Sequence, residues 1–215
     1  ADMEDILPRV EKALRDLQAQ GRAGKTIDNY AEALHSFCLW AEQRGYLAVD
    51  PLKALAPFNT TPQTYRRAMT AEEIDRLFQA CAPHRRLLYE TAFLSGLRAN
   101  ELRNLTVDHL DRERSGLILD AEWTKNRQAG FQPLPKALVE RLSAFAEAGE
   151  ADRLYEQAYT RNSGRQAQAL KGRLLYVPTH TEKIVAEDLE RAGIPPWTPQ
   201  GKVDFHALRV THPGR

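Results

Sequence analysis

The sequence predicts a mainly α-helical protein with a small antiparallel β-sheet, an α+β fold divided into two domains. Three observations predict this class. Apolar residues recur at spacings of three and four along most of the chain, the pattern of amphipathic helices. The period changes to short strand-like runs between residues 116 and 134. Residues 57–69 are rich in Pro and Thr without an apolar period, which predicts a linker between domains at 1–56 and 70–215; a long loop inside one domain is the alternative.

The composition is that of a globular chain with enough apolar material for a sizeable core. Of 215 residues, 42% are hydrophobic and 27% are charged. No apolar run reaches the length of a membrane span and the acidic N-terminus has no signal-peptide core, so we expect a cytoplasmic protein with no membrane partner. Its two cysteines, Cys38 and Cys81, are then reduced thiols. With 30 basic and 29 acidic residues, the net charge of +1 neither requires nor excludes nucleic acid.

Two amphipathic helices are predicted in the first domain, at residues 3–19 and at residues 26–44, where Gly45 supplies a stop. Asp50-Pro51 resembles a cap followed by a first-turn proline and is expected to open a short helix through Leu55. The face of the second helix that we expect to be buried carries Ile27, Tyr30, Ala31, Leu34, Phe37, Cys38 and Ala41.

The second domain opens with a capping-box pattern, Thr70 followed by Glu73, ahead of apolar residues at helical spacing. Asp204 is expected to cap a last short helix. Further helices are predicted at residues 84–94, from about Ala99, from Pro135, and at residues 181–192.

Three short strands joined by turns are predicted at residues 116–121, 122–125 and 130–134. After the helix that follows them, residues 161–175 hold basic residues and no acidic one. This tract is a basic surface or a disordered loop.

Four side chains of the second domain can carry chemistry: Arg98, Lys125, His206 and Arg209. Arg98 follows a glycine-opened turn between helices, and Lys125 lies at a strand end. His206 and Arg209 share one helix face because they are three residues apart. If these groups converge, they form a phosphate site, since Arg grips two oxygens in a fork and Lys supplies a charge or a proton.

Each residue also has an ordinary structural interpretation. Arg98 can be a surface arginine paired with Glu101, Lys125 can be solvated, and His206 can be a histidine at a helix start. A metal pair of His206 with His212 is disfavoured because a spacing of six places the two on different helix faces, and we predict no metal site.

Together and in this order, the motifs resemble those of the tyrosine recombinases, the phage-integrase family. The resemblance rests on LSGLRANELRNLTVDHLD around Arg98, on WTKN around Lys125, and on FHALRVTH around His206 and Arg209. In the first domain, TIDNYAEALHSFCLWAEQRGYLAVDPLKAL is similar to the helical, SAM-like core-binding domain of integrases. The resemblance implies a core-binding domain at 1–56 and a catalytic domain of recombinase type at 70–215.

The family implies site-specific DNA recombination or integration, as in mobile elements, without a metal or cofactor. A tyrosine attacks the scissile phosphate, which gives a 3′-phosphotyrosyl intermediate and a free 5′-hydroxyl. By this resemblance Arg98 and Arg209 clamp the non-bridging oxygens, Lys125 protonates the leaving oxygen, and His206 assists proton transfer at the nucleophile. Glu101 is expected to support Arg98. The implied location is the bacterial cytoplasm, at the nucleoid.

The chain departs from the family pattern at its end. Family members continue past the His-x-x-Arg helix to the nucleophilic tyrosine, whereas this chain stops at Arg215, after a helix-breaking Pro213-Gly214. We therefore expect an incomplete catalytic domain, from a truncated or frameshifted gene or a trimmed chain, that is inactive alone. None of the seven tyrosines is predicted as the nucleophile. The missing segment is expected to leave apolar faces exposed around Leu174, Leu175, Val177 and Leu208.

Duplex DNA is the expected partner, with full-length recombinase subunits as a second possible one. The alternative is a non-catalytic DNA-binding protein that occupies or modulates a recombination site; a third hypothesis is a helical adaptor with no nucleic-acid role. Each basic patch can also be an ordinary solvated face. The residues expected to contact DNA are Arg22, Lys25, Arg66, Arg67, Arg161, Arg165, Lys171 and Arg173.

Overall fold

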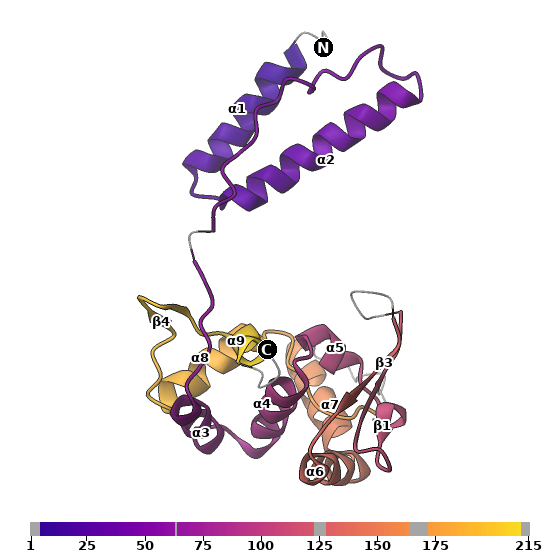
Figure 1. Cartoon of the computed structure of the whole chain (residues 1–215), viewed down its shortest axis with the longest axis vertical. Coiled ribbons are helices and arrows are strands. Elements are labelled where there is room, and N and C mark those ends of the chain that lie inside the picture. Colours follow the sequence, from indigo (N-terminus) through magenta and orange to yellow (C-terminus); the bar gives the residue numbers. More distant parts are fainter. Residues whose placement is uncertain (1–4, 63, 123–127, 164–171, 212–215) are drawn as a thin grey trace. The chain divides into compact units, whose positions relative to one another are not determined.

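The structure, a computed structural model, describes residues 5–62, 64–122, 128–163 and 172–211. It divides into two units, Ala1–Tyr65 and Arg66–Arg215, each with its own helices (Figure 1). The boundary falls inside the predicted linker. Residues Arg66 to Met69 belong to the second unit, where Met69 is buried in the core.

The first unit is a pair of helices, α1 (Ile6–Ala19) and α2 (Gly24–Gln43), covered by the segment that follows them. Leu14, Ile27 and Ala31 form its buried apolar cluster, against which Leu55 and Phe58 of the returning segment also pack. The segment approaches the start of α2 very closely: a Cβ on Gly24 would lie 1.9 Å from the backbone oxygen of Asn59. Only glycine fits at the start of α2.

The predicted helix at residues 51–55 is wrong, because residues 51–54 form turns. Asp50 does cap the chain locally, since its carboxylate accepts a hydrogen bond from the amide of Leu52 at 2.8 Å. The other carboxylate oxygen lies 2.7 Å from His35 Nε2. With the carboxylate held between a turn and α2, the chain turns back instead of continuing as a helix.

The expected burial of the α2 face is wrong in part. Ile27, Ala31, Cys38 and Ala41 are buried, but Tyr30, Leu34 and Phe37 are exposed by 50%, 42% and 62%. The apolar stripe is wider than the surface that α1 and the returning segment cover.

The second unit holds the remaining elements. Its longer helices surround one core, and a three-stranded sheet flanks it (Figure 1). The elements are α3 (Ala71–Ala80), α4 (Pro83–Ser95), α5 (Ala99–Asn104), η2 (Val107–His109), β1 (Leu110–Asp111), β2 (Gly116–Leu119), β3 (Gly130–Pro133), α6 (Lys136–Glu147), α7 (Glu150–Ser163), α8 (Thr181–Arg191), β4 (Trp197–Thr198), β5 (Gly201–Lys202) and α9 (Phe205–Val210).

The sheet is antiparallel in the order β1-β2-β3, with Leu110 opposite Leu117 and Ile118 opposite Phe131. Two of its strands were predicted, but the third partner is Leu110–Asp111 and not the predicted strand at 122–125. Glu122 lies in a turn, and residues 123–125 lie outside the described part of the chain. A two-residue strand leaves too short a pattern to be recognised in sequence.

The expectation of an exposed apolar face is wrong. Leu174, Leu175, Val177 and Leu208 are at most 1% exposed and belong to the same core as α4 and α8. Their segment is fixed by a hydrogen bond from the amide of Leu174 to the carbonyl of Leu105, at 3.1 Å. Helix α7, which precedes this segment, was not predicted. The mainly α fold with small antiparallel sheets is confirmed, and none of the described helices has the length and apolarity needed to cross a membrane.

Candidate phosphate-binding site

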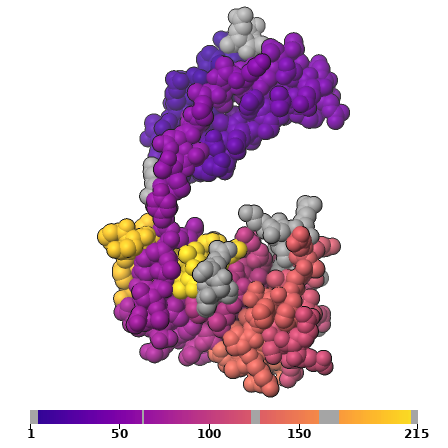
Figure 2. All heavy atoms as spheres, in the orientation of Figure 1, coloured from indigo at the N-terminus to yellow at the C-terminus, as the bar shows by residue number. Residues whose placement is uncertain are grey.

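Helix α9 presents two of the predicted residues from a buried base. Phe205, Ala207 and Leu208 are buried, whereas His206 on the opposite side is exposed and Arg209 is partly buried. Asp204 caps the helix, because its carboxylate accepts a hydrogen bond from the amide of Ala207 at 3.2 Å. The helix packs against α4 and α8 (Figure 1). Residues at the yellow end of the chain, which include α9, reach the surface of the second unit (Figure 2).

Arg98 lies at the start of α5, where the chain leaves the left-handed Gly96 at the end of α4. Glu101 accepts hydrogen bonds from both the backbone and the side chain of Arg98. One carboxylate oxygen of Glu101 accepts a hydrogen bond from Arg98 Nη1 and the other from the Arg98 backbone amide, both at 2.7 Å. Glu101 is buried, while 37% of the Arg98 side chain remains exposed. This geometry fixes the stem of Arg98 and leaves donors of its guanidinium for another acceptor.

The pKa of His206 depends on charged residues from several segments of the chain. Partial burial lowers the pKa of His206 below its usual 6.5, and the positive charges of Arg66, Arg209 and Arg98 lower it further, while Asp204 opposes them. Arg98, Arg209 and Arg66 therefore lie within electrostatic range of the same imidazole, although they come from separate segments of the chain. His206 is therefore mostly neutral at pH 7.

Arg66 was expected only as a DNA contact, yet it is part of this site. Its Nε donates to both carboxylate oxygens of Asp204, at 3.0 Å each. The sequence gives no signal of this pairing, since the two residues are 138 positions apart. Lys202 Nζ lies 3.5 Å from the same carboxylate.

Several predicted residues lie outside what the structure describes. Lys125 falls in the gap at 123–127, so its position relative to His206 stays a prediction. The same holds for Arg165, Lys171 and His212, and for the side chain of Arg161. Within the described ranges, no three His, Cys, Asp or Glu side chains form a group that could hold a metal ion.

The other predicted DNA contacts have different surroundings. Arg22 is exposed in the turn before α2, and Lys25 is exposed but lies 2.6 Å from Asp28. Arg67 is mostly buried, and its guanidinium makes two bonds to Glu73, at 2.6 and 2.7 Å. Arg173 donates from Nη1 to the carbonyl of Arg103 at 2.8 Å. Arg67 in particular has a structural partner instead of a free guanidinium.

Tyr89, Tyr155 and Tyr176 of the second unit are engaged in packing, whereas Tyr159 is 47% exposed. Tyr89 is 1% exposed and donates from its hydroxyl to the buried carboxylate of Asp188, at 2.7 Å. Tyr155 stacks edge-on against Tyr176 and accepts a hydrogen bond from the amide of Val177 at 3.0 Å. Burial raises the pKa of both Tyr89 and Tyr155, which disfavours the phenolate in each.

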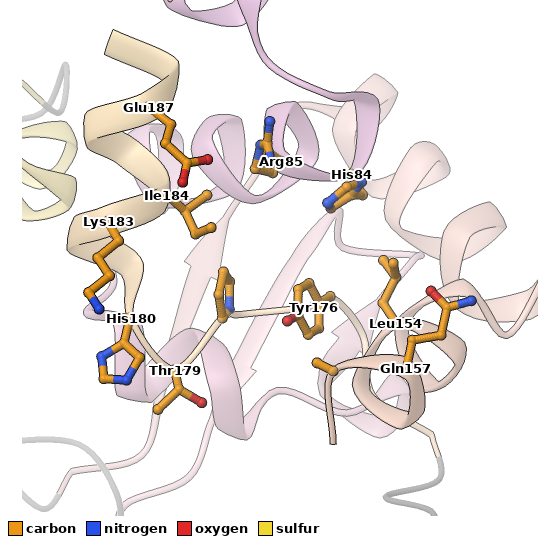
Figure 3. Close-up of a pocket in the computed structure, with 12 residues that line it drawn as sticks. His84, Arg85, Leu154, Gln157, Tyr176, Thr179, His180, Lys183, Ile184 and Glu187 are labelled. Atoms are coloured by element: carbon orange, nitrogen blue, oxygen red, sulfur yellow. The ribbon is translucent and has the colours of Figure 1, made fainter. Parts of the chain in front are cut away.

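A cavity of about 610 Å³ lies between α4, α7 and α8, lined by residues that include His84, Tyr176 and Lys183 (Figure 3). Burial lowers the pKa of His84 in its wall, and neighbouring Arg85 adds to the effect. None of the predicted site residues lines this cavity.

The second unit is thus a mainly helical domain in which the charges of three arginines act on one exposed histidine. Residues 67–213 match the model of the phage integrase family, and the chain belongs to that family. It is 26% identical over 140 residues to the tyrosine recombinase XerC of Neisseria gonorrhoeae, covering 62% of this chain and 45% of that protein. It is 29% identical over 168 residues to XerC of Mycobacterium sp. (strain KMS), and the match covers 70% of this chain and 56% of that protein. The chain thus spans about half the length of these relatives.

Solved structures share the fold at low sequence identity. A lambda integrase dimer bound to a COC′ core site gives a TM-score of 0.64 at 16% identity, over 95% of this chain and 71% of that one. The Tn1549 transposon integrase in complex with transposon right end DNA gives a TM-score of 0.68 at 13% identity, over 98% and 72%.

Proposed function

We propose that the chain binds duplex DNA and takes part in site-specific recombination, with its arginine–histidine cluster around the scissile phosphate. The observation that carries the proposal is the convergence of Arg98 and Arg209 on His206 from two separate segments. Two arginines with one neutral imidazole suit a phosphodiester, which carries a single negative charge and two non-bridging oxygens.

In the proposed mechanism Arg98 and Arg209 donate to the non-bridging oxygens and stabilise the charge that grows there in the transition state. A tyrosine oxygen attacks the phosphorus, and the bond to the 5′-oxygen breaks. Neutral His206 can accept the proton of the attacking hydroxyl. Lys125 is assigned the proton for the departing 5′-oxygen on the family resemblance alone. Glu101 keeps Arg98 in place.

We propose further that the attacking tyrosine does not come from this polypeptide. Burial raises the pKa of Tyr89 and of Tyr155, the opposite of what an activated nucleophile needs. Tyr159 is exposed, and its exclusion rests on the family resemblance, in which the nucleophile follows the His-x-x-Arg helix. The polypeptide alone is then a DNA-binding protein that does not cleave, and a tyrosine has to be supplied by another polypeptide segment or subunit.

Selection from a pool of random duplexes tests the proposal, because a site-specific recombinase enriches one defined sequence. The enriched duplex is then used in a gel shift with Arg98→Ala, Arg209→Ala and the control Arg191→Ala, an exposed arginine of α8. We expect the first two to weaken binding about tenfold or more each, since each removes a charged hydrogen-bond donor, and the control to bind like the parent. Failure to enrich any sequence would overturn the site-specific function.

A nicked duplex that traps covalent intermediates tests the origin of the tyrosine. We expect no covalent adduct with the 215-residue polypeptide. An adduct that persists after denaturation and maps to one of its tyrosines would show that the nucleophile lies within this sequence.

A further inference from the structure

The first residues of the second unit, Arg66–Met69, contact the surroundings of α9 at three points. Arg66 Nε bonds to both oxygens of Asp204, at 3.0 Å each. The amide of Arg67 donates to the carbonyl of Lys202 at 3.1 Å. The amide of Met69 donates to Thr211 Oγ1 at 2.9 Å. We call this four-residue segment the clasp.

The two outer contacts meet the two ends of α9. Asp204 is the residue before the helix, and its Oδ1 also accepts from the amide of Ala207 at 3.2 Å. Thr211 is the residue after the helix, and its hydroxyl also donates to the carbonyl of Ala207 at 2.7 Å. Each end of the helix is therefore tied through one side chain both to the helix itself and to the clasp.

The clasp is itself firmly held. The Arg67 guanidinium makes two bonds to the mostly buried Glu73, and Met69 is only 6% exposed in the core. In contrast, α9 has six residues, too few for a helix to be stable without tertiary support. A fixed segment that bonds to both ends of a short helix determines where that helix lies.

We propose that the clasp positions His206 and Arg209, and that Asp204 and Thr211 are positioning residues of the site. The proposal rests on the proposed function for its significance, because His206 and Arg209 matter as phosphate ligands. It assigns Arg66 a task beyond contact with DNA. Because the second unit begins at Arg66, α9 is tied to the first residues of its own unit.

A double-mutant cycle tests the clasp, with Arg66→Ala at one end of α9 and Thr211→Ala at the other. The readouts are amide hydrogen exchange in α9 and the ring resonances of His206, followed by NMR in the full chain. We expect each single variant to speed exchange at Ala207 to Val210 roughly fivefold or more, since each removes the hydrogen bonds that one side chain makes at an end of α9. The double variant is expected to depart from the product of the single effects by about twofold or more, since both ends depend on one segment.

Two controls separate this role from a local one. Thr211→Ser keeps the hydroxyl and is expected to restore both the exchange rates and the His206 resonances. Thr160→Ala, at an exposed threonine of α7, is expected to change neither. Multiplicative single effects, or an Arg66→Ala variant that weakens duplex binding but leaves α9 exchange unchanged, would overturn the clasp. Duplex binding by the parent chain tests the proposed function separately, because the exchange readout needs no DNA.

Discussion

At the scale of single residues, partial burial holds the pKa of His206 below 6.5, and the charges of Arg66, Arg209 and Arg98 lower it further. A phosphate brought among these arginines adds a second negative charge to that of Asp204. The neutral imidazole is then stabilised less, relative to its protonated form, than in the free protein. Binding of DNA and protonation of His206 are therefore linked.

We predict that the pKa of His206 lies below 6.5 in the free protein and rises in the duplex complex. Because the complex then takes up protons, duplex affinity is expected to increase as pH falls from 8 through the titration range of His206. NMR titration of the imidazole with and without duplex measures both values, and His206→Gln should remove this part of the pH dependence. An unchanged pKa in the complex would place the phosphate away from His206.

Tyr89 is a core residue whose hydroxyl bonds to a buried carboxylate. Replacing Tyr89 with Phe deletes the hydroxyl that donates to the buried Asp188. We predict a loss of about 1–3 kcal/mol in the free energy of unfolding, because a buried carboxylate loses a donor. Urea denaturation measures it, with the exposed Tyr65→Phe as the control that should leave stability unchanged. Duplex affinity of the folded Tyr89→Phe protein should match the parent.

At the scale of elements, the start of α3 shows how one carboxylate can serve several partners. Glu73 completes the capping box with Thr70, as the sequence predicted, and also receives both bonds from Arg67. The Arg67 bonds lower the pKa of Glu73 below 4.5. A carboxyl group with a lowered pKa stabilises the folded state above its unfolded pKa, and this contribution is lost as pH falls through the lower, folded value.

We predict that Arg67→Ala destabilises the protein by about 3 kcal/mol, since it leaves a mostly buried carboxylate without its charged partner. The matched variant Arg22→Ala removes an exposed arginine and should leave the unfolding free energy within about 0.5 kcal/mol of the parent. Denaturation curves at pH 7 compare the two. Equal stability of the two variants would mean that the Arg67–Glu73 pair contributes nothing to the fold.

The elements that could be predicted from sequence are those whose signals are local. The capping pair Thr70 and Glu73 and the cap at Asp204 need only neighbours within three residues, and both are present. The short helix after Pro51 failed although its local signal was good, because a contact between Asp50 and His35 of α2 competes with it. Strand Leu110–Asp111 has too few residues for any pattern and is defined by its pairing with β2.

At the scale of the whole molecule, what the sequence could not reveal are pairings between distant positions. The four motif residues were predicted because their local settings and order match a family, whereas the pairing of Arg66 with Asp204 is visible only in the structure. The same limit explains the burial of Leu174 and Leu175. Their partners come from helices far away in sequence, so the chain end gave no guide to their exposure.

We predict that duplex affinity of the full chain falls steeply with salt, because basic residues release counterions from the phosphates they contact. If Arg22 contacts a phosphate, Arg22→Ala should lower the slope of log K against log salt by about 0.9. Fluorescence anisotropy at several salt concentrations gives this slope. Replacing the mostly buried Arg67 is not expected to change the slope. A slope unchanged by Arg22→Ala would show that Arg22 does not contact a phosphate.

The close approach at Gly24 has a consequence for comparing this chain with its relatives. Because a Cβ there would overlap the oxygen of Asn59, the first turn of α2 and the returning segment can pack together only while this position has no side chain. In an alignment of homologues, glycine at position 24 should therefore occur together with a returning segment of the same length. Relatives with a larger residue there are expected to route the chain differently between their two units.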